Sequence, residues 1–94
     1  MADPQLELGR LLMTRAVATD VDTIQVMECV GRHLRGDYGD TPPEDCRLNV
    51  LAIREGCGRV MSNYQLPDGS RLWISTDGIG TPDHHTLAMR PSDY

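Results

Sequence analysis

Residues 67–69 read Pro-Asp-Gly and separate two short segments whose side chains alternate in character. Pro restricts φ, Asp bonds its own backbone and Gly accepts a positive φ, so this tripeptide predicts a tight turn. Residues 59–66 (RVMSNYQL) before it and residues 71–76 (RLWIST) after it alternate as strands do. The second half of the chain is therefore predicted to form an antiparallel hairpin.

Alternation in the second strand of this hairpin separates its side chains between two faces. Leu72 and Ile74 share one face, whereas Trp73, the only tryptophan in the chain, lies on the other. Two interpretations of Trp73 follow. It packs beneath the helices as part of the core, or it stands on an open sheet face as an interface anchor.

The segment after residue 19 is predicted to form a first helix, capped by Thr19 or Asp20. Basic residues in its last turn and Gly36 after them are typical of a helix end. The expected apolar stripe has the three-to-four-residue spacing of one helix face. Its members are Ile24, Met27, Val30 and Leu34.

A second helix is predicted over residues 42–55. Thr41 is the expected cap, prolines follow where no N–H is needed, and Glu44 stands three residues after the cap. Cys46, Val50 and Ile53 are expected to share the buried face, and Gly56 or Gly58 to end the helix.

Residues 9–17 and 84–90 are predicted to form the first and last strands. The order is therefore β-α-α-β-β-β, which predicts an α+β fold with an antiparallel sheet and two helices packed on one face. The 94 residues suffice for one domain, 1–94, in which residues 1–8 are expected to be flexible.

The chain has 14 acidic residues and nine arginines, with no lysine, for a net charge of -5. This balance argues against direct binding to nucleic acid or to an anionic membrane surface. Apolar runs are too short to span a membrane, and the first residues lack a secretory signal. An odd count of three cysteines fits free thiols, so the cytoplasm is the expected compartment.

Four carboxylates lie within nine positions of one another, around a tyrosine. They are Asp37, Asp40, Glu44 and Asp45, with Tyr38 between the first two. Three interpretations are open: a solvated loop with helix caps, a protein-binding patch, or a cation site, although the spacing is not that of an EF-hand. We predict a partner-binding surface made of Asp37, Tyr38, Asp40, Glu44, Asp45 and Trp73.

No catalytic residue, cofactor or metal is predicted. His84 and His85 are neighbours on a strand and point to opposite faces, and no zinc-binding spacing occurs. The glycines at 78 and 80 lack the remaining residues of a phosphate-binding loop.

Several short motifs resemble a family of small proteins described as plasmid-related or phage-associated. The resembling segments are residues 32–40, 44–49, 58–64, 66–69, 72–74 and 91–94, with GDYGD, LPDG, LWI and PSDY among them. The chain departs from the family pattern at residues 77–89, where the relatives carry an acidic-Arg-Ser turn followed by threonines. The resemblance implies an accessory gene of a mobile element, with no assigned reaction and no catalytic residues.

Charge and resemblance together predict a small acidic mobile-element protein that binds another protein with a basic, nucleic-acid-binding surface. Inhibition of a host defence nucleoprotein complex, as anti-CRISPR proteins perform it, is the expected role. The element order is also that of RelE-type ribosome-dependent RNase toxins, for which Arg59, Arg71 and Arg90 would contact RNA. A structural module that forms homodimers is the third alternative.

Overall fold

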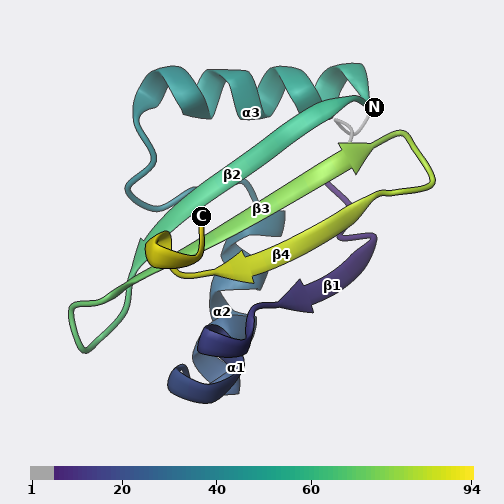
Figure 1. The fold of residues 1–94 in the computed structure, drawn as a ribbon. Coiled ribbons are helices and arrows are strands. Elements are labelled where there is room, and N and C mark those ends of the chain that lie inside the picture. The colour runs from purple at the N-terminus through teal and green to yellow at the C-terminus, as the bar shows by residue number, and fades with distance from the viewer. Residues whose placement is uncertain (1–5) are drawn as a thin grey trace.

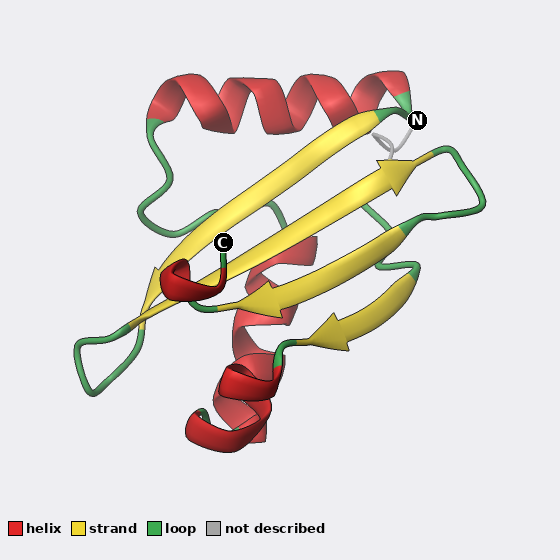
Figure 2. Ribbon diagram, in the orientation of Figure 1, coloured by secondary structure: helices red, strands yellow, loops and turns green. Residues whose placement is uncertain are grey.

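The structure, a computed structural model, describes residues 6–94. Its helices and strands give the α+β fold that the sequence predicts (Figures 1 and 2). In chain order they are β1 (Arg10–Met13), α1 (Arg15–Asp20), α2 (Thr23–Leu34), α3 (Pro43–Glu55), β2 (Gly58–Gln65), β3 (Arg71–Ile79), β4 (His85–Met89) and a closing 3-10 turn, η1 (Pro91–Asp93).

The four strands form one mixed sheet in the order β1-β4-β3-β2. The predicted hairpin is confirmed, because β2 and β3 pair antiparallel on either side of the Pro-Asp-Gly turn, and β4 pairs antiparallel with β3. The expectation of a wholly antiparallel sheet is wrong at β1, which runs parallel to β4 with Arg10 opposite His85. Its partner lies at the other end of the chain, so no local pattern reveals the direction of pairing.

The first strand is shorter than predicted, because Thr14 starts a helix that the sequence analysis missed. The Thr14 hydroxyl accepts a hydrogen bond from the Val17 N–H at 3.3 Å and caps α1. Val17 is fully buried, so the apolar residue that suggested a longer strand belongs to this helix instead. Residues 6–94 therefore contain three α-helices, where the sequence predicts two.

In α2 the buried stripe differs from the predicted one. Ile24 and Met27 are 69% and 47% exposed, whereas Val30 of the predicted stripe is buried and Leu34 packs against the core. The buried residues of this helix are Val26, Cys29, Val30 and His33. Both stripes have helical spacing, but the correct one contains a histidine whose burial is offset by two hydrogen bonds, which an apolar pattern does not reveal. The helix cap is Asp22, which accepts from the Ile24 N–H at 2.7 Å.

The range of α3 agrees with the prediction, and Gly56 ends it at φ 69°. Thr41 does not cap it, because its hydroxyl donates to the Tyr38 carbonyl at 2.8 Å instead. The inward face of α3 carries the buried residues Asn49 and Ala52, while Val50 is exposed. Cys46 and Ile53 pack against the core as predicted, so the prediction is wrong only for Val50.

The main core lies on one face of the sheet, under α1 and α2, while α3 runs beside the edge strand β2 (Figure 1). The residues that fill this core from the helices and the strands include Val17, Val26, Val30, Tyr64, Leu72, Ile74 and Ala88. In the described part of the chain, the η1 turn lies over the opposite face of the sheet (Figure 2). This arrangement leaves one side of β2 and β3 open next to α3.

Part of the N-terminal segment expected to be flexible is packed against the fold. Leu6 is buried beside α3, and the Thr86 hydroxyl donates to the Leu8 carbonyl at 2.8 Å. Leu6 and Leu8 therefore have defined contacts with the fold, and residues 1–5 lie outside the described part of the chain. Within residues 6–94, no helix has the length and apolar character needed to cross a membrane.

Candidate functional site

Two of the four clustered carboxylates are engaged by arginines of the same chain. Asp37 accepts from Arg32 at 2.7 Å, and Asp40 forms an ion pair with Arg71. Hydrogen bonds from Arg32 and then from the Gly39 N–H hold the pKa of Asp37 below its ordinary value. The charges of Asp37 and Asp40 are thus already compensated within the chain, which leaves less negative charge to attract a partner.

Tyr38 is 7% exposed and packs with Leu6, Val60 and other apolar side chains. Its burial raises the pKa of its phenol. The expectation of an exposed tyrosine anchor is therefore wrong. The cause lies next to it, because Gly39 forms a bridge to Asn63 on β2 and draws the loop against the sheet edge.

Glu44 and Asp45 lie in the first turn of α3, where the helix dipole favours negative charge. Both are exposed, and neither forms an ion pair with an arginine among residues 6–94. These two carboxylates therefore remain free to meet a cation from outside.

Trp73 stands on the open face, away from α2, so the alternative that places it under the helices is wrong. It is half-buried and forms a T-shaped pair with the ring of Tyr94, with 5.6 Å between the ring centroids. Tyr94 reaches this position because Asp93 fixes the η1 turn, accepting from the Arg90 N–H at 3.0 Å and from the Thr14 hydroxyl at 2.8 Å.

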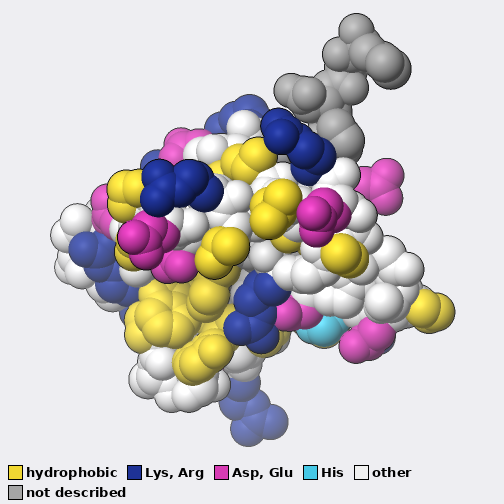
Figure 3. Space-filling view, turned by 90° about the horizontal axis from the view of Figure 1, so that it is seen from above, with side chains coloured by type: hydrophobic (Ala, Val, Ile, Leu, Met, Phe, Trp, Pro, Cys, Tyr) yellow, Lys and Arg dark blue, Asp and Glu magenta, His cyan; other side chains and the backbone are white. Residues whose placement is uncertain are grey.

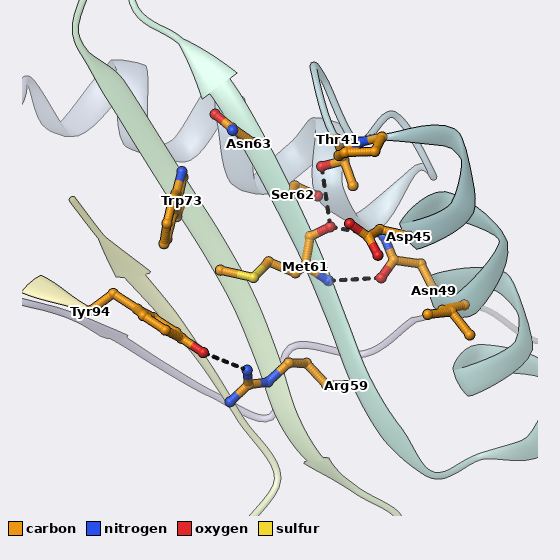
Figure 4. Close-up of a pocket in the computed structure, with 11 residues that line it drawn as sticks. Thr41, Asp45, Asn49, Arg59, Met61, Ser62, Asn63, Trp73 and Tyr94 are labelled. Carbon is orange, nitrogen blue, oxygen red and sulfur yellow. Dashed lines mark hydrogen bonds between the residues drawn. The ribbon is translucent and has the colours of Figure 1, made fainter. Parts of the chain in front are cut away.

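Trp73 is part of a groove between α3 and the open face of the sheet, with a volume of about 490 Å³ (Figure 4). Met61, Asn63 and Trp73 form its floor on β2 and β3. Pro42, Asp45, Leu48 and Asn49 line the side formed by α3, and Arg59 and Tyr94 lie at the other side. Of the predicted site residues, Asp45 and Trp73 meet here, whereas Asp37, Tyr38, Asp40 and Glu44 do not line the groove.

The edge of β2 beside the groove is closed to a further strand. The Asn49 amide donates to the Met61 carbonyl at 2.8 Å and its oxygen accepts from the Met61 N–H at 2.9 Å. The loop around Gly39 engages the next outward residue, since the Asn63 N–H donates to the Tyr38 carbonyl and the Asp40 N–H donates to the Asn63 carbonyl. A partner at this edge must therefore insert side chains rather than add a β-strand.

Two buried polar atoms on the groove floor have no hydrogen-bond partner among the described residues. They are the indole N–H of Trp73, a donor, and the side-chain oxygen Oδ1 of Asn63, an acceptor. The two residues stand opposite each other on β3 and β2. Because buried polar atoms are nearly always paired in proteins, an unpaired donor and acceptor in one groove point to a missing ligand.

The groove continues into an exposed apolar surface on α3. Leu48 is 60% exposed and Leu51 about half exposed, one helical turn apart. Viewed from above α3, single hydrophobic side chains stand among charged ones, and a larger group of hydrophobic side chains lies beside them (Figure 3).

Arg59, at the far side of the groove, is neutralised by its own chain. It donates to Asp77 at 2.6 Å and to the Tyr94 hydroxyl at 3.4 Å. Burial of Asp77 opposes its ionisation, but hydrogen bonds from Arg59 and Ser75 lower its pKa overall. Of the three arginines considered for RNA contact, Arg71 and Arg90 also face carboxylates, at Asp40 and Asp20.

The histidines and cysteines of residues 6–94 do not form a group that would hold a metal ion. His84 and His85 bond different backbone carbonyls, those of Glu7 and Asp83. Cys29 is buried, Cys46 half-buried and Cys57 exposed, all as free thiols.

Sequence reasoning missed Leu48, Asn49, Asn63 and Tyr94 as parts of the site. Asn49 carried a signal, because a polar residue within an apolar helical stripe indicates a buried hydrogen-bonding role. Tyr94 carried none, since its position depends on a turn that folds the chain end over the sheet.

Comparison of the chain with protein-family models, curated proteins and solved structures finds no match. The resemblance to plasmid-related and phage-associated proteins therefore stays a prediction. The function is argued below from the residues of the groove.

Proposed function

We propose that this protein acts by binding another protein, and that the groove between α3 and the open sheet face is its docking site. The observation that carries the proposal is the unpaired donor of Trp73 and acceptor of Asn63 on the floor of one groove. A partner that fills the groove would pair both atoms and cover the apolar floor around Met61.

The exposure of the groove walls favours a macromolecule over a small molecule. Small ligands are enclosed by their sites, with about 70–90% of their surface buried. Here Leu48 is 60% and Tyr94 is 74% exposed, and the apolar surface extends along α3 to Leu51. A protein surface laid across α3 and the groove would cover all three side chains.

The charge distribution supports a partner with a basic surface, such as one that binds nucleic acid. The chain carries a net charge of -5, and Glu44 and Asp45 at the start of α3 have no arginine partner among residues 6–94. In this proposal the protein occupies the nucleic-acid site of a host defence complex and inhibits it. Electrostatic attraction would speed association and make binding sensitive to salt.

The RNase toxin alternative receives less support. The arginines that would hold RNA phosphates are paired with carboxylates in the folded chain, and breaking those pairs would weaken RNA binding further. A toxin arrests growth when its expression is induced, and Arg59→Ala would relieve that arrest. Growth arrest that Arg59→Ala relieves would contradict the binding proposal and favour the RNase toxin.

The dimerisation alternative would use the same apolar surface. Leu48 and Leu51 would then meet a second copy of the chain instead of another protein. Sedimentation of the isolated protein separates the two possibilities. A dimer predicts that the measured mass rises with protein concentration. It also predicts that Leu48→Gln restores the mass of the monomer.

Affinity capture with matched variants tests the proposal. Wild-type protein, a groove variant (Leu48→Gln with Tyr94→Ser) and a control (Ile24→Gln with Met27→Gln) are used as baits in lysate of a bacterium that carries a defence nucleoprotein complex. The control removes two exposed apolar side chains from α2, on the other side of the sheet. We expect wild type and control, but not the groove variant, to recover a nucleic-acid-binding protein and to inhibit its activity. Equal recovery by the groove variant, or no such protein with wild type, would contradict the proposal.

A further inference from the structure

We infer that the groove binds an arginine side chain presented by the partner protein. This inference rests on the proposed function and names the chemistry of the docked residue. It combines three features of the groove: paired aromatic rings, an unpaired acceptor on the floor and a free carboxylate on one wall.

The aromatic rings suit a planar cation. Trp73 and Tyr94 form a T-shaped pair at 70°, in which one ring covers at most one face of the other, so an aromatic face remains for a guest. A guanidinium group is flat, weakly hydrated and stacks on aromatic faces. Trp73 is the stronger of the two platforms, because indole has the most negative ring face.

The unpaired polar atoms match the two polar parts of an arginine residue. Oδ1 of Asn63 needs a donor, and a guanidinium group offers five N–H donors. The Trp73 indole N–H needs an acceptor, which the backbone carbonyl of the arriving residue supplies. Both atoms are buried, so the proposal requires these cross-strand neighbours to turn toward the guest when it enters the groove.

The charges on the two sides of the groove favour a cation. Asp45 on α3 faces the groove and has no arginine partner among residues 6–94. Arg59 on the opposite side is already held by Asp77 at 2.6 Å, so its positive charge is compensated. Between them, Met61 and Leu48 provide apolar surface against which the methylene stem of an arginine packs.

Lysine fits the same site less well. Its ammonium group is a compact, strongly hydrated charge, so it neither stacks on Trp73 nor divides its donors between Asn63 and Asp45 in one plane. Citrulline keeps the planar shape and loses the charge, so it isolates the contribution of Asp45.

The test uses 15N-labelled full-length protein and N-acetyl-arginine methylamide as the probe. Because Trp73 is the only tryptophan, a single indole N–H signal and the intrinsic fluorescence both report on the groove. We expect the arginine probe to shift the indole signal, with dissociation in the millimolar range for so small a ligand. The lysine and citrulline counterparts should bind about tenfold more weakly. Asp45→Asn should weaken the arginine probe several-fold, while Glu28→Gln, an exposed carboxylate on α2, should leave it unchanged.

An indole signal that does not move with arginine, or that moves equally with all three probes, overturns the inference. The proposed function is judged separately by groove-dependent capture of a partner. Capture without arginine recognition would mean that a protein docks through other side chains. Failure of both tests would reject the groove as a binding site.

Discussion

The side chain of Asn49 holds the backbone of Met61 through two hydrogen bonds, of 2.8 and 2.9 Å, as a neighbouring strand would. Asn49 is almost fully buried, and through this contact α3 takes the place of a fifth strand beside β2. The same contact closes the sheet edge and positions one side of the groove.

Asn49→Ala should reduce the free energy of unfolding by about 2 kcal/mol, because it leaves the Met61 N–H without a partner and the Met61 carbonyl with only a long contact of 3.4 Å from the Thr41 hydroxyl. Val50→Ala on the exposed side of the same helix should change it by less than about 0.5 kcal/mol. Urea unfolding followed by circular dichroism measures both. Similar losses in the two variants would mean that Asn49 does not hold the edge strand.

Gly39→Ala should destabilise the fold by about 3 kcal/mol, because φ is +64° and a Cβ atom would lie 2.3 Å from the Asn63 carbonyl oxygen. Gly56→Ala is the matched control, with φ +69° and no atom within 4 Å of the added Cβ. It should lose only about 1 kcal/mol of stability. Thermal unfolding of both variants gives the comparison, and an equal loss would exclude the close approach at Asn63.

His33 lies at the centre of a buried chain of hydrogen bonds whose direction can be worked out. Thr86 donates to the Leu8 carbonyl, so Thr76 must donate to Thr86 at 2.7 Å. Thr76 therefore accepts from Nε2 of His33 at 2.9 Å. Nδ1 of His33 then carries no proton and accepts from the Ser62 hydroxyl at 2.6 Å. The neutral Nε2–H tautomer satisfies every group in this chain.

Stability should fall between pH 6.5 and about 4, because burial lowers the pKa of His33 from 6.5 to about 4. In this pH range His33 is protonated in the unfolded chain but stays neutral in the folded protein. Because the unfolded state binds the extra proton, a lower pH favours unfolding. Well above pH 6.5 the His33 side chain is neutral in both the folded and the unfolded chain, so it causes no loss of stability there. The full loss is about 3 kcal/mol, at 1.36 kcal/mol per pKa unit.

Urea unfolding at pH 7.5, 5.5 and 4.5 measures this dependence. His85→Asn removes a histidine outside the buried hydrogen-bond chain and should keep the same slope with pH. Equal stability at pH 7.5 and 4.5 would show that His33 is not buried in its neutral form.

The sequence predicted the fold class and the hairpin because both depend on local signals, at the Pro-Asp-Gly turn and in the alternation of residues 59–66. The parallel pairing of β1 with β4 could not be predicted from local signals, because the two strands come from opposite ends of the chain. Charge patterning likewise identified Asp37 and Asp40 as acidic residues but not their pairing with Arg32 and Arg71.

The candidate site was predicted only in part, because local sequence signals identify some of its residues while others are brought there by contacts between distant parts of the chain. Trp73 was identified from strand alternation and Asp45 from the clustering of four carboxylates. Asn63 and Tyr94 enter the groove through tertiary contacts, the first across the hairpin and the second through the η1 turn. Tyr38 was misjudged, because the positive φ of Gly39 turns the loop toward the sheet and buries the ring.

Salt dependence offers a check on the electrostatic part of the account. Asp45→Asn should slow association with the captured partner and flatten its dependence on ionic strength, because an unpaired carboxylate beside the groove attracts a basic surface. Glu28→Gln on α2 changes the net charge equally and should leave the rate almost unchanged. Association rates from surface plasmon resonance at about 50 and 300 mM salt distinguish the two. Equal effects would assign the attraction to net charge alone.

The most direct test of the docking site is the Trp73 indole N–H signal of 15N-labelled protein, recorded as the captured partner is added. The account predicts that this single signal shifts or broadens, together with the Asn63 side-chain amide. A complex that forms while both signals stay in place, with changes confined to the α2 face around Ile24 and Met27, would contradict it.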